Sequence, residues 1–362
     1  MLYRVIGLMS GSSLDGLDIA FVEFNEQAGK WEYQLAAAAC YEYTIELKEE
    51  LRQATQFSAL DYQLLHTRYG RHLGEMVNRF IEEHELHYKV CLVSSHGHTS
   101  FHLPAQRMTA QLGDGAAIAA ETRLPVVSDL RALDVAFGGE GAPIVPIGEK
   151  LLFPQYKFLL NLGGIANLSI VDEGNYLAFD ICPANRVLNL LVNSEGLEYD
   201  DEGKLARSGT VNLTLLEALN GLSYYSTSPP KSLANGFGTN EVYPLTRSFQ
   251  LSTADSLRTF VEHIVIQISN AVPSNQEAAY SQMLVTGGGA FNSFLVERLQ
   301  EQLQSHQIEV VVPNEQTVRY KEAIVMALIG VLRWRQEYNV LASVTGAERN
   351  SIGGALWIGQ EA

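Results

Sequence analysis

The segment YRVIGLMSGSSLDGLDIAFVEF, residues 3–24, decides the fold predicted for this chain. Tyr3–Leu8 and Asp18–Phe24 are apolar runs typical of strands, and small residues separate them, so we expect a hairpin. Gly11 and Gly16 allow positive φ angles and leave room for a ligand near the loop. Backbone N–H groups and serine hydroxyls in such a loop suit phosphate oxygens. An ordinary tight turn with a polar tip is the alternative that these residues leave open.

The composition limits the class of protein. At 362 residues the chain is long enough for two domains. Its formal net charge of −16 argues against nucleic acid or an anionic membrane as the main partner. Cys40, Cys91 and Cys182 are isolated thiols, which predicts a reducing compartment and no disulfide framework. We find no signal-peptide pattern and no apolar run of about 18 residues, and therefore expect a cytoplasmic protein.

Strand and helix patterns alternate along the rest of the chain, which predicts an α/β fold. The segment Val135–Pro146 is rich in Gly and Pro and is the predicted domain boundary. We therefore expect an N-terminal domain over 1–134 and a C-terminal domain over 135–362, with the final residues able to pack back on the first domain.

The second half repeats the arrangement of the opening segment. Phe158–Leu162 and Leu168–Val171 read as strands around the loop Gly163–Asn167, so each half carries one hairpin loop of phosphate size. Further on, a strand breaks into Thr286–Asn292, which has three glycines before a predicted helix. Helix N-termini attract anions, although glycines for tight strand–helix packing explain this pattern equally well.

Asp180 closes an apolar strand, where α/β enzymes often keep catalytic groups. A pKa raised by burial would make it a better base, and a turn carboxylate is the equal alternative. His96, His98 and His102 have metal-like spacing but no nearby Cys, so hydrogen bonding to a substrate or to the backbone is favoured over zinc ligation. Cys182 is expected to be a small buried side chain.

Together these blocks resemble the anhydro-N-acetylmuramic acid kinases, which belong to the superfamily of acetate and sugar kinases, heat-shock chaperones and actin. The matching segments run in family order over essentially the whole chain: GLMSGSSLDGLDIA, SSHGHTSFH, QLGDGAAIAAETRLPVVSDLR, DVAFGGEGAPIVP, LNLGGIANLSI, FDICPANRVLN, YDDEGKLARSG, PPKS, LVTGGGAFNSFL, EA at 322–323, and SVTGA. The chain departs from the family after Lys231-Ser232, where Leu233–Gly236 lacks the usual Arg–Glu pair, and at Leu130–Asp134, which keeps one Arg.

The resemblance implies two actin-like, ribonuclease H-like α/β domains with an ATP cleft between them, and it assigns site residues. Asp180 falls on the catalytic carboxylate, and Thr99, Arg131 and Glu322 fall on substrate positions. The implied nucleotide-binding residues are Gly11, Ser12, Ser13, Leu14, Asp15, Gly16, Leu17, Asp18, Asn161, Gly163, Gly164, Asn167, Gly287, Gly288, Gly289 and Asn292. Mg²⁺ is expected on the ATP phosphates, with Asp15 or Asp18 as its candidate protein ligands.

The implied reaction opens 1,6-anhydro-N-acetylmuramic acid with water and phosphorylates O6 from ATP and Mg²⁺, giving N-acetylmuramic acid 6-phosphate during peptidoglycan recycling. The expected partners are the anhydro amino sugar and ATP, and a homodimer is left open. Two alternatives remain. One is an ordinary sugar hydroxyl kinase of the same superfamily. The other is a non-catalytic ATP-dependent interaction protein, which the lack of an extra domain or exposed apolar run disfavours.

Overall fold

The computed structural model describes residues 1–11, 14–172, 175–229, 231–234, 236–273 and 280–359. It divides into two compact units, the first comprising Met1–Pro154 with Tyr320–Ala362 and the second comprising Gln155–Arg319. This division differs from the predicted boundary between residues 134 and 135. The reason is that helix α5 (Pro146–Leu152) belongs to the first unit, where it packs on strand β3 (Lys30–Glu42) and places Gly148 against Val325.

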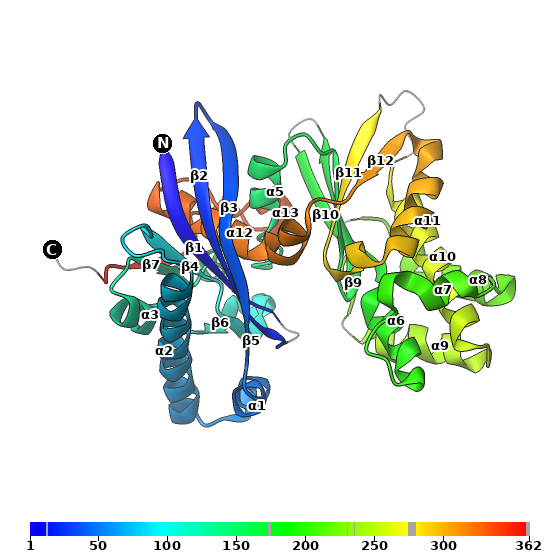
Figure 1. Ribbon diagram of the computed structural model, residues 1–362, viewed down its shortest axis with the longest axis horizontal. Coiled ribbons are helices and arrows are strands. Elements are labelled where there is room, and N and C mark those ends of the chain that lie inside the picture. Colours follow the sequence, from blue (N-terminus) through cyan, green and yellow to red (C-terminus); the bar gives the residue numbers. More distant parts are fainter. Residues whose placement is uncertain (12–13, 173–174, 230, 235, 274–279, 360–362) are drawn as a thin grey trace. The chain divides into compact units, whose positions relative to one another are not determined.

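The sheet of the first unit is built on the predicted hairpin (Figure 1). Strands β1 (Leu2–Ser10), β2 (Gly16–Gln27) and β3 form an antiparallel meander. Strand β4 (Leu92–Ser95) lies parallel to β1, and β7 (Val126–Ser128) lies parallel to β4. Near the end of the chain, β13 (Ala355–Trp357) pairs antiparallel with β7 and completes the order β13-β7-β4-β1-β2-β3.

Helix α2 (Ala59–Glu83) supplies much of the core that supports this sheet. Ser58 caps its N-terminus by accepting a hydrogen bond from the Asp61 N–H. Its buried positions recur at helical spacing and meet the alternating buried residues of β1 and β2, such as Ile6 and Leu8. The remaining helices are α1 (Ile45–Gln53), α3 (Gly115–Thr122), α4 (Ala132–Ala136), α13 (Ala342–Thr345) and the main part of α12 (Glu315–Trp334).

A separate two-stranded sheet, formed by β5 (His98–Leu103) and β6 (Met108–Leu112), was not predicted. The pair is antiparallel and has an irregular register between Thr99 and Phe101. Its first strand, HTSFHL, does not alternate, and the alternation in the second, MTAQL, spans only five residues, so the usual strand signal is weak. This hairpin matters because it carries His98, Thr99 and His102.

The second unit has a five-stranded sheet in the order β10-β9-β8-β11-β12. Its strands are β8 (Phe158–Leu162), β9 (Ile165–Asp172), β10 (Asn175–Pro183), β11 (Ser281–Thr286) and β12 (Ile308–Val311). The first three are antiparallel neighbours, while β11 runs parallel to both β8 and β12. Both units therefore share the order third, second, first, fourth and fifth strand, which confirms the predicted α/β class with two ribonuclease H-like units.

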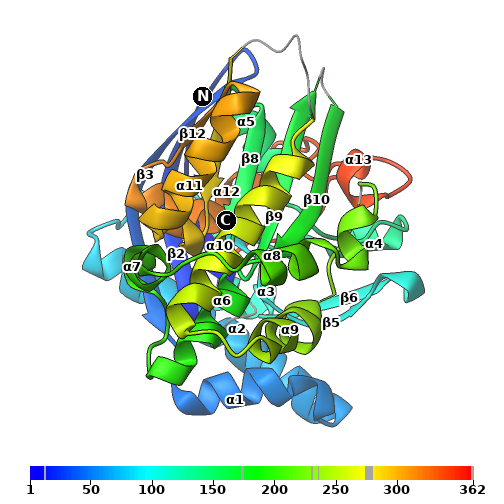
Figure 2. The same cartoon turned by 90° about the vertical axis from the view of Figure 1, so that its right-hand side faces the viewer.

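Helix α10 (Thr253–Ala271) is the centre of the second core, and Figure 2 shows it beside α11 (Ser293–Leu303) along the sheet. Its buried Phe260 and Ile264 pack with the inward-facing Leu160 and Phe179 of the sheet. Its His263 is fully buried, with ring nitrogens 2.7 Å from Asn220 Oδ1 and 2.9 Å from Tyr225 Oη. The other helices are α6 (Asn185–Val192), α7 (Lys204–Ser208), α8 (Leu213–Asn220) and α9 (Tyr243–Ser248).

Within the described residues, no helix combines the length and the apolar character that crossing a membrane requires.

Candidate functional site

The first hairpin loop joins β1 to β2, and the pairing of Ser10 with Leu17 closes it. Ser12 and Ser13 lie outside the described residues. The positive φ angle in this loop belongs to Leu14, at +59°, and Leu14 N donates to Gly11 O at 3.4 Å. Gly16 was predicted to allow a positive φ, which it does not adopt; a Cβ there would lie 2.6 Å from Tyr41 O, so its missing side chain makes room for the close approach of β3.

Two of the first unit's candidate carboxylates influence each other electrostatically. Asp18 on β2 accepts a hydrogen bond from the Cys40 thiol, whose pKa is raised to about 12, mainly by burial and then by this contact. Solvent reaches part of the Glu322 side chain on α12. Desolvation of its carboxyl group by the surrounding protein nevertheless raises its pKa. The Lys321 charge lowers that pKa, while Asp18 and Glu149 raise it further. Asp15 is exposed at the loop.

The structure brings Thr99 and Arg131 together, although they are far apart in the sequence. Arg131 Nη1 donates to Thr99 Oγ1 at 2.9 Å, and Arg131 Nε donates to Gly141 O at 2.6 Å. Its Nη2 lies 3.3 Å from His102 Nδ1. The guanidinium is buried, which lowers its pKa, and Asp134 offsets part of that shift. These hydrogen-bond partners are uncharged, so the site offers a desolvated positive charge to a polar or anionic ligand.

His96, His98 and His102 each have a ring nitrogen within 3.5 Å of a polar atom. His96 Nδ1 lies 2.9 Å from Gly97 O, and burial together with the Arg131 charge lowers the His96 pKa to about 4. His102 approaches Arg131 and Thr109. Over the part of the chain that the structure describes, no group of three or more His, Cys, Asp or Glu side chains could hold a metal ion.

In the second unit, the N-terminus of α6 holds the second hairpin loop. Ala184 N and Asn185 N donate to Gly164 O and Gly163 O at 2.9 and 3.1 Å. The Asn185 side chain adds a bond from Nδ2 to Leu162 O at 3.0 Å. The Arg186 guanidinium lies over the loop, with its Nε 3.6 Å from where a Cβ on Gly164 would stand. The sequence reasoning missed Asn185 and Arg186, although both follow the FDICPA block directly.

One row of polar residues crosses the second sheet. Asp180 pairs with Asn167, which pairs with Asn161, and Asn161 pairs with Thr286. Residues paired in register point to the same face of a sheet, so strand pairing gathers four polar side chains that are dispersed in the sequence. Thr286 Oγ1 is buried and has no hydrogen-bond partner among the described residues. Thr286 opens the predicted segment Thr286–Asn292 but was given no role of its own, and its buried hydroxyl is available to a ligand.

The third loop follows β11 directly. Gly287 has a φ of +82°, and a Cβ there would stand 2.5 Å from Asn161 Oδ1 and 2.8 Å from Leu162 O. Asn292 caps α11, because its Oδ1 accepts from Leu295 N at 3.0 Å. Any contact of Asn292 with a nucleotide would therefore use its amide nitrogen.

We expect Gly287→Ala to weaken the binding of a non-hydrolysable ATP analogue at least about tenfold, or ~1.4 kcal/mol. Gly287 combines a positive φ of 82° with an extended ψ of 166°, a conformation that costs a side chain about 1–3 kcal/mol, and the added methyl group would push on the Leu162 carbonyl. Titration calorimetry measures the affinity. Gly196→Ala is the matched control, since Gly196 also has a positive φ, +75°, but lies outside the proposed nucleotide loops and a Cβ there would have no atom within 4 Å. Equal affinities of the two variants would contradict this prediction.

Asp180 stands at an irregularity of β10, where the register with β9 shifts between Asp180 and Cys182. Its Oδ2 accepts from Leu233 N at 2.8 Å and from Ser232 Oγ at 3.3 Å. Oδ1 accepts no bond from the described residues. Burial raises the Asp180 pKa, and the two hydrogen bonds lower it in part. A fixed carboxylate with one uncommitted oxygen can accept a proton.

The segment 231–233 therefore contributes to the site directly. Asp180 N donates to Lys231 O at 3.0 Å, and Tyr224 Oη donates to Asp180 O at 2.8 Å. Asp180 is thus held through both its backbone and its side chain. Leu233 directly precedes the residues 234–236 that depart from the family pattern, and its backbone N–H makes the shorter of the two carboxylate contacts. Asn235 lies outside the described residues.

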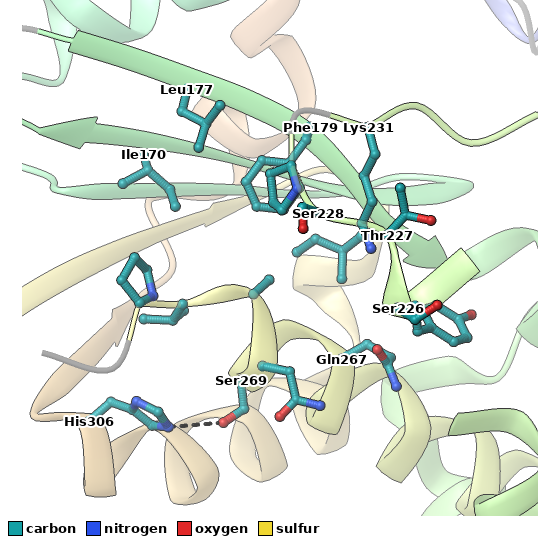
Figure 3. A pocket seen from close by; sticks show the side chains of 17 residues that line it. Ile170, Leu177, Phe179, Ser226, Thr227, Ser228, Lys231, Gln267, Ser269 and His306 are labelled. Atoms are coloured by element: carbon teal, nitrogen blue, oxygen red, sulfur yellow. Dashed lines mark hydrogen bonds between the residues drawn. The ribbon is translucent and has the colours of Figure 1, made fainter. Parts of the chain in front are cut away.

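The second unit has a cavity of about 660 Å³ on the face of its five-stranded sheet opposite to the Asp180 carboxylate (Figure 3). It is lined by Phe179 and Ile181 of β10, by Lys231, and by Gln267 and His306. Phe179 and Ile181 belong to the core on the α10 side. Side chains alternate along a strand, so Asp180 between them points to the opposite face. The cavity is therefore distinct from the surface that carries the Asp180 carboxylate.

The comparisons with known proteins agree over almost the whole chain. The family model described as anhydro-N-acetylmuramic acid kinase matches residues 3–359. An anhydro-N-acetylmuramic acid kinase from Sulfurovum sp. (strain NBC37-1) is 33% identical over 368 residues, covering 98% of this chain and 99% of the relative. One from Vibrio vulnificus (strain YJ016) is 32% identical over 370 residues, covering 97% of both chains.

Solved structures with similar folds include the activator of the 2-hydroxyisocaproyl-CoA dehydratase from Clostridium difficile with bound ADPNP. It is 14% identical, with a TM-score of 0.46, and the match covers 92% of this chain and 96% of that one. The extent of the family match and the identity to full-length relatives lead to one conclusion: the chain belongs to the anhydro-N-acetylmuramic acid kinase family.

Proposed function

We propose that this chain is an ATP-dependent kinase that opens 1,6-anhydro-N-acetylmuramic acid with water and phosphorylates its O6. The product would be N-acetylmuramic acid 6-phosphate, and the pathway would be the recycling of peptidoglycan in the cytoplasm. Membership of the family supports the activity. The observation that carries the mechanism is Asp180, a carboxylate held through Oδ2 by Leu233 and Ser232, whose Oδ1 accepts no hydrogen bond from the described residues.

The bicyclic substrate requires an external nucleophile, because its O6 is bonded to the anomeric carbon. In the proposed reaction Asp180 removes a proton from water, and the water oxygen bonds to that carbon. The C1–O6 bond breaks, and O6 bonds to the γ-phosphorus of ATP as ADP leaves. The raised pKa of Asp180 suits a general base, since the ideal base has a pKa nearer the working pH.

The sugar-binding role is proposed for Thr99, Arg131 and Glu322 of the first unit. Arg131 and Thr99 form one hydrogen-bonded pair, and the buried guanidinium suits oxygen atoms of the amino sugar. Glu322 has a raised pKa and offers a carboxyl group that can bond a sugar hydroxyl. The Arg131 environment favours a ligand that carries negative charge, as the lactyl carboxylate of a muramoyl sugar does.

Phosphate binding is proposed for the glycine loops of both units, with Arg186 as an additional cation beside Gly164. Asp18 is the proposed ligand of a Mg²⁺ ion carried by ATP. Its negative charge raises the pKa of a second carboxyl group, Glu322, and a bound cation would reduce the repulsion between the two carboxylates. Asp15 is the exposed alternative. When bound, Mg²⁺ would neutralise phosphate charge during the transfer. We also propose that the protein forms a homodimer, and we assign no residues to its interface.

The experiment is mass spectrometry of the product made from ATP, Mg²⁺ and 1,6-anhydro-N-acetylmuramic acid in ¹⁸O-water. The expected product carries one ¹⁸O on the anomeric carbon and none in the phosphoryl group. It must be sampled early, because the anomeric hydroxyl exchanges with solvent. Label in the phosphoryl group, or no sugar phosphate at all, would refute the proposal. Phosphorylation of a free sugar hydroxyl with no ring opening would favour the ordinary hydroxyl kinase.

A further inference from the structure

We propose that His98 is a positioning residue that holds the first phosphate loop from inside the first unit. The inference rests on the proposed function, in which the loop beginning at Gly11 binds ATP phosphates. His98 is the first residue of β5, and its side chain is only 6% exposed. A hydrogen-bonding interaction with the Gly11 backbone raises the pKa of His98 and opposes the larger lowering by burial. The Gly11 carbonyl accepts a hydrogen bond from Leu14 N at 3.4 Å.

A chain of buried hydroxyl groups reaches the same point from the opposite side. The hydroxyl oxygen of Tyr69, on α2, lies 2.7 Å from that of Tyr43, which directly follows β3. Tyr43 Oη donates to Ser10 Oγ at 2.8 Å. Ser10 Oγ in turn lies 3.5 Å from His98 Nδ1, a long contact at the limit of a hydrogen bond. Ser10 is the last residue of β1, where the loop leaves the sheet.

We call Tyr69, Tyr43, Ser10 and His98 the loop-support chain. Its members come from α2, from the turn after β3, from β1 and from β5. All four side chains are buried, so their polar groups cannot bond to water. Hydrogen bonds within the chain compensate for that loss. A loop that binds phosphate through backbone groups must present them in one orientation before the ligand arrives. The loop-support chain fixes the residue that enters the loop and the Gly11 backbone within it.

The alternative is that His98 only fills space in the first unit. Burial lowers the His98 pKa, so the ring is neutral near pH 7 and can donate from one nitrogen while accepting at the other. A space-filling role would be satisfied by an apolar side chain of similar size. A positioning role would not, because the Gly11 backbone would lose its imidazole partner and Ser10 its polar neighbour.

The test compares His98→Leu, His98→Asn and His72→Leu. His98→Asn keeps polar atoms near the position of Nδ1. His72 stacks against the rings of Tyr43 and Tyr69 and is not among the described partners of Ser10 and Gly11, so it is the matched control. Each variant is measured for melting temperature, for affinity toward a non-hydrolysable ATP analogue, and for KM and kcat with each substrate.

His98→Leu is expected to raise the Kd of the analogue and the KM for ATP about tenfold while leaving the KM for the sugar unchanged. His98→Asn should recover most of that loss, and His72→Leu should bind the analogue like the unaltered protein. A Ser10→Ala, His98→Leu double variant should lose less than the product of the two single losses, since both act on one loop.

Unchanged ATP affinity in His98→Leu would overturn the inference, and so would an equal rise of both KM values. If His98→Leu fails to fold, His98→Asn and Ser10→Ala carry the test: normal ATP affinity in both would also overturn it. A failure of the unaltered protein to bind the analogue or phosphorylate the sugar would instead overturn the proposed function, which keeps the two failures distinguishable.

Discussion

Replacing Asp180 with Asn should lower the turnover of the anhydro sugar by about 10²–10⁴-fold, the usual contribution of a general base. The amide matches the carboxylate in shape, and its oxygen can still accept the hydrogen bond from Leu233 N. It cannot take a proton from water. The affinity for an ATP analogue should stay within about twofold of normal, because the phosphate loops are unaltered.

The measurement is a steady-state assay of ADP release with titration calorimetry on the same preparation. Asp201→Asn is the matched control, since Asp201 belongs to the same unit and makes an exposed ion pair with Lys204. That variant should retain full turnover. Near-normal turnover of Asp180→Asn would refute the assignment of the base. Loss of ATP binding by the same variant would show that Asp180 supports the nucleotide loops instead.

Lys321→Met should destabilise the protein by about 3–5 kcal/mol, as expected when one partner of a buried ion pair is removed. Lys321 Nζ lies 3.0 Å from Glu149 Oε1, and both side chains are 5% exposed. The pair joins α12 to α5 within the first unit. Without the ammonium group, Glu149 would remain as a buried carboxylate, or would take up a proton, and either outcome disfavours the folded state.

Urea unfolding followed by circular dichroism measures this change as a shift of the midpoint. Lys204→Met is the matched control: its ion pair with Asp201 is similarly short, at 2.6 Å, but both side chains are more than 60% exposed. The control should unfold at the normal midpoint. The double variant Lys321→Met, Glu149→Leu should recover most of the lost stability, because no charge is left buried. Equal midpoints for Lys321→Met and Lys204→Met would contradict the prediction.

Most of the regular structure was predictable from local patterns. The apolar runs around residues 3–24 and 158–171 predicted hairpins, and the structure has β1–β2 and β8–β9 at these places. The β5–β6 hairpin was missed, because β5 does not alternate, β6 is only five residues long, and both lie outside the main sheets. Periodicity reports burial of one face, and this hairpin buries neither face fully.

The candidate site was less predictable, because its geometry depends on contacts between distant residues. The sequence indicated Asp180 as a candidate base because it ends a strand. It did not indicate that Ser232 and Leu233 donate hydrogen bonds to this carboxylate. Thr99 and Arg131 were assigned only by resemblance, and the fold alone brings them to 2.9 Å. Gly16 was expected to leave room for a ligand, but the group that approaches it is Tyr41 of β3, and this strand pairing cannot be seen in the hairpin's own sequence.

The sequence by itself determined the α/β class, the position of both glycine-rich hairpins and the place of Asp180 at the end of an apolar strand. These depend on short-range preferences: apolar alternation, β-branched residues and glycine at tight turns act within a few positions of one another. Only the tertiary structure decided which side chains share a site. The row from Asp180 to Thr286 exists because four strands pair in one register. His98 meets Gly11 because β5 folds back to the end of β1, and such contacts follow from packing of the whole unit.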